Sequence, residues 1–211
     1  MEYKVAVIIP TLNEEKFIAR CLDSVIEQSY PFRDMDVMVV DGGSNDRTRE
    51  IVEEYGRKYI NIRFIHNPGR IQSIAFNIGV ENSDAPYIVR LDAHALYNKD
   101  YIEKCIDGLQ NDTQIGNVGG RCKILPFNDT LWANTNAILN YSRFGIGGSA
   151  FRVGVKPDFV DSVPFGAFPR TVFEKVGGMR EDLPRAEDNE YNSRIRKAGY
   201  KVFFNPEIVS S

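Results

Sequence analysis

The sequence has no long hydrophobic run. Its first apolar stretch, residues 5–9, ends at Pro10, far short of the roughly 20 apolar residues that a membrane-spanning helix needs. The same stretch is too short for the core of a signal peptide, and no cleavage-like site follows it. The sequence therefore predicts a soluble domain without a membrane span or secretion signal.

Cysteine is scarce, and neither sign of charge dominates. The three cysteines, Cys21, Cys105 and Cys122, form no CxxC pair and leave an odd count, which favours a reduced, cytoplasmic location. With 26 Lys and Arg against 29 Asp and Glu, the net charge is −3. No bulk positive field attracts nucleic acid or anionic lipid, so local groups must hold any anionic ligand.

The composition is that of an ordinary globular protein. The 211 residues are 43% hydrophobic and 26% charged, and we find no internal repeat and no long linker. These values exclude a disordered chain, a collagen-like fibre and a low-complexity array. We expect a single domain, residues 1–211, with a ligand-binding half (1–110) and a second half (111–211).

Short β-rich runs alternate with helical patterns over the first 110 residues. Strands are predicted at residues 5–9, 37–40, 61–65 and 87–91. The first helix is expected to begin at Asn13 as its N-cap, and the others lie around residues 51–55, 71–80 and 101–109. This order predicts an α/β fold with a mostly parallel, helix-covered central sheet, in the manner of a Rossmann-like α/β/α sandwich.

The pattern is less regular after residue 115. Strands are expected at residues 118–125, 160–168 and 200–204, and helices at 131–141, 170–176 and 187–198. The Gly-rich segment 145–154 contains the pattern GxGxxA, which also occurs in dinucleotide-binding motifs. A dinucleotide fingerprint must follow a strand and open a helix, and this segment does neither. We interpret it instead as a loop able to cover a ligand.

Two aspartates follow predicted strands, at the sheet edge where open α/β folds bind ligands. Asp41 precedes two glycines, so a plain turn is an equal explanation for it. Asp92 stands two residues before His94, a spacing that lets both side chains reach one divalent cation in extended backbone. The alternative is a turn aspartate beside a histidine that only packs or forms hydrogen bonds. For an Asp-x-His pair taken by itself, this alternative is favoured.

A cluster of acids opens the last predicted helix. Glu187, Asp188 and Glu190 lie in its first turn, and basic residues follow in its last. This arrangement complements the helix dipole, which is sufficient explanation by itself. The functional alternative is that one of these acids faces the ligand crevice as a general base.

Taken together and in order, these pieces resemble the inverting family 2 glycosyltransferases, which have the GT-A fold. The matching segments are Pro10-Thr-Leu-Asn-Glu14, Asp41-Gly-Gly-Ser-Asn-Asp46, Asn67-Pro-Gly-Arg70, Arg90-Leu-Asp92-Ala-His94 and Glu187-Asp188. The resemblance covers nearly the whole chain and is strongest to the branch that acts in succinoglycan and other exopolysaccharide synthesis. It implies transfer of a sugar from a nucleotide-sugar donor, UDP-linked, to a glycan or lipid-linked acceptor with inversion.

The resemblance also implies roles for individual residues. Those expected at the nucleotide are Pro10, Thr11, Glu14, Asp41, Arg70 and Asp92. Asp92 and His94 would hold a divalent metal, Mn²⁺ or Mg²⁺, and Asp188 would deprotonate the acceptor hydroxyl. An acceptor or lid role falls to Glu187, Glu190, Gly147 and Gly148.

Two departures from the family pattern matter. The usual motif is Asp-x-Asp, whereas His94 replaces the last acid here, and the chain ends at Ser211, soon after the expected base. We therefore expect a catalytic domain truncated at its C-terminus, with membrane association only through segments absent from this chain. The alternative function is a catalytically weak nucleotide-sugar-binding protein of the same fold.

Overall fold

The computed structural model describes residues 2–123, 154–183 and 185–211. They form an eight-stranded sheet in the order β3-β2-β1-β4-β7-β5-β8-β6. The strands are β1 (Val5–Thr11), β2 (Met35–Asp41), β3 (Ile62–His66), β4 (Tyr87–Arg90), β5 (Ile115–Cys122), β6 (Asp158–Phe159), β7 (Ala167–Pro169) and β8 (Lys201–Ser210). The helices are α1 (Ile18–Ile26), α2 (Thr48–Lys58), α3 (Gln72–Glu81), α4 (Tyr101–Asn111), α7 (Arg170–Val176) and α8 (Glu187–Lys197).

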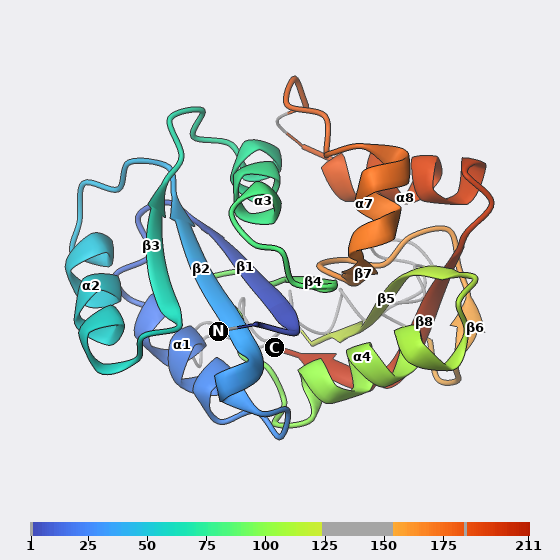
Figure 1. Cartoon of the computed structure of the whole chain (residues 1–211), viewed down its shortest axis with the longest axis horizontal. Coiled ribbons are helices and arrows are strands. Elements are labelled where there is room, and N and C mark those ends of the chain that lie inside the picture. Colours follow the sequence, from blue (N-terminus) through green and yellow to red (C-terminus); the bar gives the residue numbers. More distant parts are fainter. Residues whose placement is uncertain (1, 124–153, 184) are drawn as a thin grey trace, which may run out of the picture.

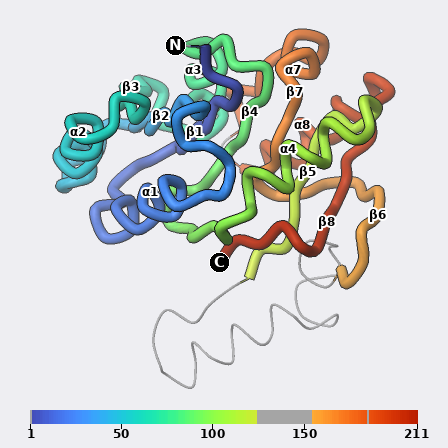
Figure 2. Tube along the Cα trace, turned by 60° about the horizontal axis from the view of Figure 1, so that its bottom comes forward, coloured from blue at the N-terminus to red at the C-terminus, as the bar shows by residue number. Residues whose placement is uncertain are grey.

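The sheet is mixed, with its parallel strands grouped. β1 pairs in parallel with β2 and β4, and β2 with β3. β7 is antiparallel to both β4 and β5, and so joins the first half of the chain to the second. Figure 2 shows these halves side by side, meeting at β4 and β7. The mostly parallel α/β sheet predicted from the sequence is confirmed.

Helices cover both faces of the sheet (Figure 1). In β1, Val5, Val7 and Ile9 join the core cluster beneath α1, α2 and α4, whereas Ala6 and Ile8 join the cluster beneath α3, α7 and α8. Successive side chains of a strand point to opposite faces, so a strand covered on both sides needs an unbroken apolar run. That run was the first structural signal in the sequence.

The first helix begins later than expected. Asn13 does not cap it; this residue has φ 57°, and α1 begins at Ile18. The backbone N–H groups of Asn13 and Glu14 donate instead to the hydroxyls of Ser44 and Thr48, each at 2.8 Å. These hydrogen bonds between loops replace the local cap and tie the segment after β1 to the segment after β2.

The second half departs further from the predicted boundaries. β5 begins at Ile115 instead of residue 118, and β8 continues to Ser210 instead of ending at 204. Residues 160–168 do not form one strand, because Phe165 and Gly166 have φ of 60° and 86° and break the extended backbone before β7. The predicted helix 131–141 and the Gly-rich segment up to residue 153 lie outside the described residues.

Among the described residues, no helix has the length and apolar character needed to cross a membrane.

Candidate active site

The loops after β1, β2 and β4 meet at one edge of the sheet, as the parallel order predicted. Thr11 is in register with Asp41, and Asp41 with His66. The N–H of Gly42 donates to the carbonyl of Thr11 at 2.8 Å. β4 ends at Arg90, two residues before Asp92. This edge holds two adjoining pockets.

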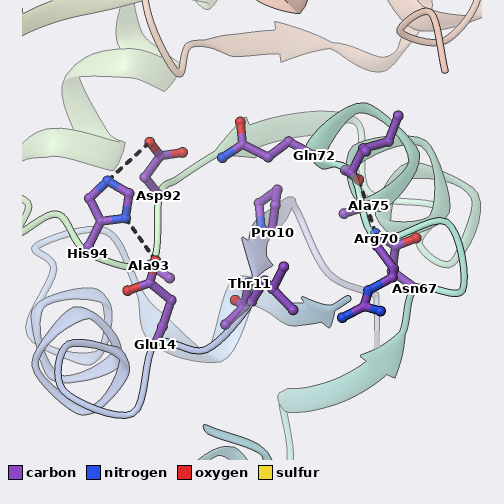
Figure 3. Close-up of a pocket in the computed structure, with 12 residues that line it drawn as sticks. Pro10, Thr11, Glu14, Asn67, Arg70, Gln72, Ala75, Asp92, Ala93 and His94 are labelled. Carbon is purple, nitrogen blue, oxygen red and sulfur yellow. Dashed lines mark hydrogen bonds and ion pairs between the residues drawn. The ribbon is translucent and has the colours of Figure 1, made fainter. Parts of the chain in front are cut away.

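The first pocket has a volume of about 280 Å³ and gathers most of the residues expected at the nucleotide and the metal. Its lining includes Pro10, Thr11, Glu14, Arg70, Asp92 and His94. Figure 3 shows Glu14, Asp92 and His94 on one side of it and Arg70 on the other, with Pro10 and Thr11 between them. A cationic group thus faces a carboxylate–imidazole cluster across the pocket.

Arg70 is set in place by its loop. The residue has φ 65°, and the Asn67 side chain organises the turn, since it accepts from Gly69 N–H and donates to the Ile71 carbonyl, both at 3.0 Å. Gly42 approaches the same loop closely: a Cβ there would lie 3.2 Å from Arg70 Cα. The glycine after β2 therefore allows the Arg70 loop to pack against the end of the sheet.

Asp41 lies beside the first pocket but does not line it. The residue is 2% exposed. One carboxylate oxygen accepts from the N–H groups of Gly43 and Ser44, each at 2.9 Å, and the other accepts from the Ser44 hydroxyl. These contacts are those of a turn. The role of Asp41 at the nucleotide stays a prediction.

Glu14, His94 and Asp92 form a chain of contacts. His94 Nδ1 lies 3.0 Å from Glu14 Oε1, and His94 Nε2 lies 4.0 Å from Asp92 Oδ2. A carboxylate only accepts hydrogen bonds, so Nδ1 carries the proton. The hydrogen bond with Glu14 raises the pKa of His94. Burial raises the pKa of Asp92, although the positive charges of Arg90 and His94 oppose this.

Asp92 and His94 fit a divalent cation in their chemistry. A neutral imidazole that donates Nδ1–H to a carboxylate offers Nε2 as a ligand, and Nε2 is the atom that faces Asp92. Asp92 Oδ1 is buried without a hydrogen-bond partner. No group of three or more His, Cys, Asp or Glu side chains in the described part of the chain is arranged to hold a metal alone. Water and substrate phosphates would complete such a site, as they commonly do for Mg²⁺.

The second pocket, of about 440 Å³, adjoins the first, and Asp92 and Gln72 line both. Asp188 and Glu187 contribute to it from the first turn of α8. Asp188 is paired with Arg90 Nη1, and its side chain is 26% exposed. Burial, opposed by the charge of Arg90, raises the pKa of Asp188 to about 6. Such a value suits a group that accepts a proton near neutral pH.

The remaining predicted site residues are placed differently. Glu190 is 2.7 Å from Arg194 on its own helix and lines neither pocket. Gly147 and Gly148 lie outside the described residues. Their acceptor or lid roles stay predictions.

The sequence interpretation assigned no role to two residues that the structure brings into the site: Arg90, which stands only as part of a matching segment, and Gln72. Arg90 is 2% exposed, and its Nη2 donates to Gln72 Oε1 at 3.0 Å. One signal was available: a buried arginine must be paired, and this one ends the short, otherwise apolar strand β4. No comparable signal marked Gln72.

Comparison with known proteins identifies the family. The model of the family described as glycosyl transferase family 2 matches residues 6–177. The chain belongs to this family. Its membership confirms the resemblance seen in the ordered motifs.

Two curated relatives match over most of this family 2 chain. One is a dolichyl N-acetyl-alpha-D-glucosaminyl phosphate 3-beta-D-2,3-diacetamido-2,3-dideoxy-beta-D-glucuronosyltransferase of Methanococcus voltae, 30% identical over 98% of the chain. The other is the succinoglycan biosynthesis protein ExoA of Rhizobium meliloti, 31% identical over 93%. The chain spans 66% of the first relative and 59% of the second.

Solved structures confirm the GT-A fold. The mannosyltransferase PcManGT of Pyrobaculum calidifontis, in complex with GDP-Man and Mn²⁺, has a TM-score of 0.73 and 25% identity, with 100% of this chain and 56% of that chain covered. S. aureus TarS in complex with UDP has a TM-score of 0.74 and 18% identity, with 100% and 59% covered.

Proposed function

We propose that this chain is the catalytic domain of a glycosyltransferase in exopolysaccharide or cell-envelope polysaccharide synthesis. It transfers a sugar from a UDP-linked donor to a glycan or lipid-linked acceptor, with inversion, at the cytoplasmic side of the membrane. One observation carries the proposal: a pocket with an Asp–His pair and a facing arginine adjoins a pocket with a half-buried carboxylate. A donor and an acceptor need two adjoining sites of these kinds.

In the first pocket the chain holds the nucleotide. Pro10 and Thr11 line the pocket from the end of β1, and Glu14 lies beside His94. Arg70 supplies positive charge from the facing loop. Asp41 supports the uridine end by fixing the turn that follows β2. Because the net charge of the chain is −3, these local groups, not a general field, attract the anionic donor.

Asp92 and His94 hold the divalent cation, Mn²⁺ or Mg²⁺. A bound cation stabilises the negative charge that gathers on the leaving diphosphate. Glu14 keeps the proton of His94 on Nδ1 and so directs Nε2 toward Asp92. The mannosyltransferase relative, solved with GDP-Man and Mn²⁺, supports a sugar nucleotide together with a metal.

In the second pocket Asp188 accepts the proton of the acceptor hydroxyl. As the hydroxyl oxygen bonds to the anomeric carbon, the bond from that carbon to the diphosphate breaks, and the proton passes to the Asp188 carboxylate. The acceptor enters from the second pocket and the diphosphate leaves into the first. Attack and departure on opposite sides invert the configuration in one displacement.

Calorimetric titration of UDP into the chain, with and without Mn²⁺, tests the donor site, with GDP as the comparison nucleotide. We expect UDP to bind more tightly than GDP and more tightly with Mn²⁺. UDP binding indifferent to Mn²⁺ would move charge stabilisation from Asp92 and His94 to Arg70. Preference for GDP would refute the uridine assignment, and failure of both nucleotides to bind would refute the donor site in this chain.

A further inference from the structure

Arg90 connects elements that are far apart in the sequence. It ends β4, and its side chain is 2% exposed. Its guanidinium lies 3.6 Å from Asp92 in the following loop, 3.3 Å from Glu187 in α8, and in direct contact with Asp188. Gln72, at the start of α3, accepts from Nη2 at 3.0 Å. One buried cation thus contacts residues that belong to both pockets.

The charges around this guanidinium do not balance. Three carboxylates face one cation, and the hydrogen-bonding group that also holds it, Gln72, is neutral. An arginine side chain is not deprotonated in proteins, even when it is buried. Arg90 therefore stays charged.

A second ion pair, between buried Asp36 and a partly exposed arginine, Arg63, makes a useful contrast. Arg63 makes two parallel hydrogen bonds to Asp36, at 2.9 and 2.7 Å, at the start of β2. Arg63 pairs with a single carboxylate, and its other hydrogen bond is to the carbonyl oxygen of Asn82, at 2.9 Å. Arg90 instead is shared among carboxylates that line pockets, and Asp92 Oδ1 and Arg90 Nε remain without a hydrogen-bond partner.

We propose that Arg90 is a positioning residue: it keeps Asp188 as a carboxylate directed into the second pocket and steadies Asp92 at the junction of the two pockets. The same guanidinium thereby fixes the position of the proposed base, Asp188, relative to the first pocket, where the donor binds. The inference rests on the proposed function, since it takes Asp188 as the base.

The first test measures the pKa of Asp188 by carbon-13 NMR of labelled aspartate carboxyl groups, and needs no substrate. The Asp188 signal is the one absent from Asp188→Asn. The charged groups that face Asp188 are Arg90, Glu187 and Asp92. In Arg90→Gln only like charges remain, so we expect the pKa of Asp188 to rise by about 1 to 3 units.

The matched control is the same substitution at a structural arginine. Arg170 is half-buried in α7, and its guanidinium donates to the carbonyl oxygens of Ala85 and Val80, at 2.8 and 3.3 Å. Arg170→Gln should lower the melting temperature and leave the pKa of Asp188 unchanged. An unchanged pKa in folded Arg90→Gln, or an equal rise in Arg170→Gln, would overturn the proposal.

The second test separates positioning from binding. With the UDP-sugar that binds best, Arg90→Gln should lower kcat by about 100-fold, as expected for a displaced catalytic group, and leave the Kd for UDP measured without Mn²⁺ unchanged. Arg90→Lys keeps the charge but loses the planar guanidinium that contacts several partners. Its kcat should therefore lie between those of the wild type and Arg90→Gln. If Arg90→Gln does not fold, Arg90→Lys decides: a wild-type kcat in this variant would refute the positioning role.

The two tests keep this inference separable from the proposed function. If UDP binds and the pKa of Asp188 does not respond to Arg90→Gln, only the positioning role fails. If no nucleotide binds to the wild-type chain, the proposed function fails, whereas the NMR result on Arg90 and Asp188 still stands or falls on its own measurement.

Discussion

Replacing the proposed base, Asp188→Asn, should abolish activity without weakening the fold. Loss of a general base costs about 10²- to 10⁴-fold in rate, and we expect a fall of this size in nucleotide release from the UDP-sugar in the presence of acceptor. Asp188 does not line the first pocket, so the affinity for UDP should stay at the wild-type value. The substitution is nearly isosteric, and the amide oxygen of the introduced asparagine can still accept a hydrogen bond from Arg90.

The effect on stability follows from the pKa of Asp188. Burial raises it from 3.8 to about 6, so above pH 6 the folded chain must hold an ionised group that its surroundings disfavour. A shift of about two units corresponds to about 3 kcal/mol. The folded state binds more protons than the unfolded state between pH 4 and 6, so this group's contribution to stability falls as the pH rises through that range.

Asparagine avoids this cost, since it carries no charge. At pH 7.5 we expect Asp188→Asn to unfold at a higher temperature than the wild type, by up to the equivalent of about 3 kcal/mol, with the difference vanishing below about pH 4. Arg90 retains Glu187 and Asp92 at 3.3 and 3.6 Å, so the variant leaves no unpaired cation. A variant that is less stable than the wild type at pH 7.5, or one that keeps its rate, would refute the reasoning.

Four further outcomes are expected. The wild-type rate should fall below about pH 6, because Asp188 must be ionised to accept a proton; a pH–rate profile flat down to pH 5 would contradict this. His94→Ala should remove the gain in UDP affinity that Mn²⁺ gives and spare metal-free binding, as measured by calorimetry. Gly79→Ala should cost about 1 to 3 kcal/mol in urea unfolding by overpacking, since its Cβ would lie 2.6 Å from Ile8 Cγ2; wild-type stability would contradict this. Arg63→Met should cost about 1 to 3 kcal/mol, because it leaves Asp36 buried and unpaired, without altering UDP affinity; any loss of affinity would show that the pair serves the site.

The first half of the fold could be predicted because its strands are covered on both faces. Such strands must be continuously apolar, and β1 and β2 are buried at every residue. The expected helix at residues 170–176 also matches α7. The start of α1 could not be predicted from local residues, since the hydroxyls that bind the N–H groups of Asn13 and Glu14 lie 31 and 34 residues away.

The second half was harder for a different reason. Two of its strands, β6 and β7, have only two and three residues, and nearby backbone conformations cannot be predicted from the residue types. Phe165 and Ala186 have positive φ, which residues with a β-carbon adopt rarely, and both line the second pocket. Long-range packing imposes such conformations, so periodicity alone predicted one strand over residues 160–168, where the structure has only the start of β7.

The site shows the same division between local and long-range information. Asp41 and Asp92 look equivalent in the sequence, because each follows an apolar strand. In the structure the two aspartates differ in the hydrogen bonds that their carboxylate oxygens accept. Both carboxylate oxygens of Asp41 accept hydrogen bonds from Gly43 and Ser44 in its own turn. Asp92 lies at the junction of the two pockets: its Oδ1 accepts no hydrogen bond and lies 3.6 Å from Arg90, and its Oδ2 lies 4.0 Å from His94 Nε2. The Asp41 carboxylate therefore shapes its own turn, whereas Asp92 lines both pockets and is the better candidate to hold a cation.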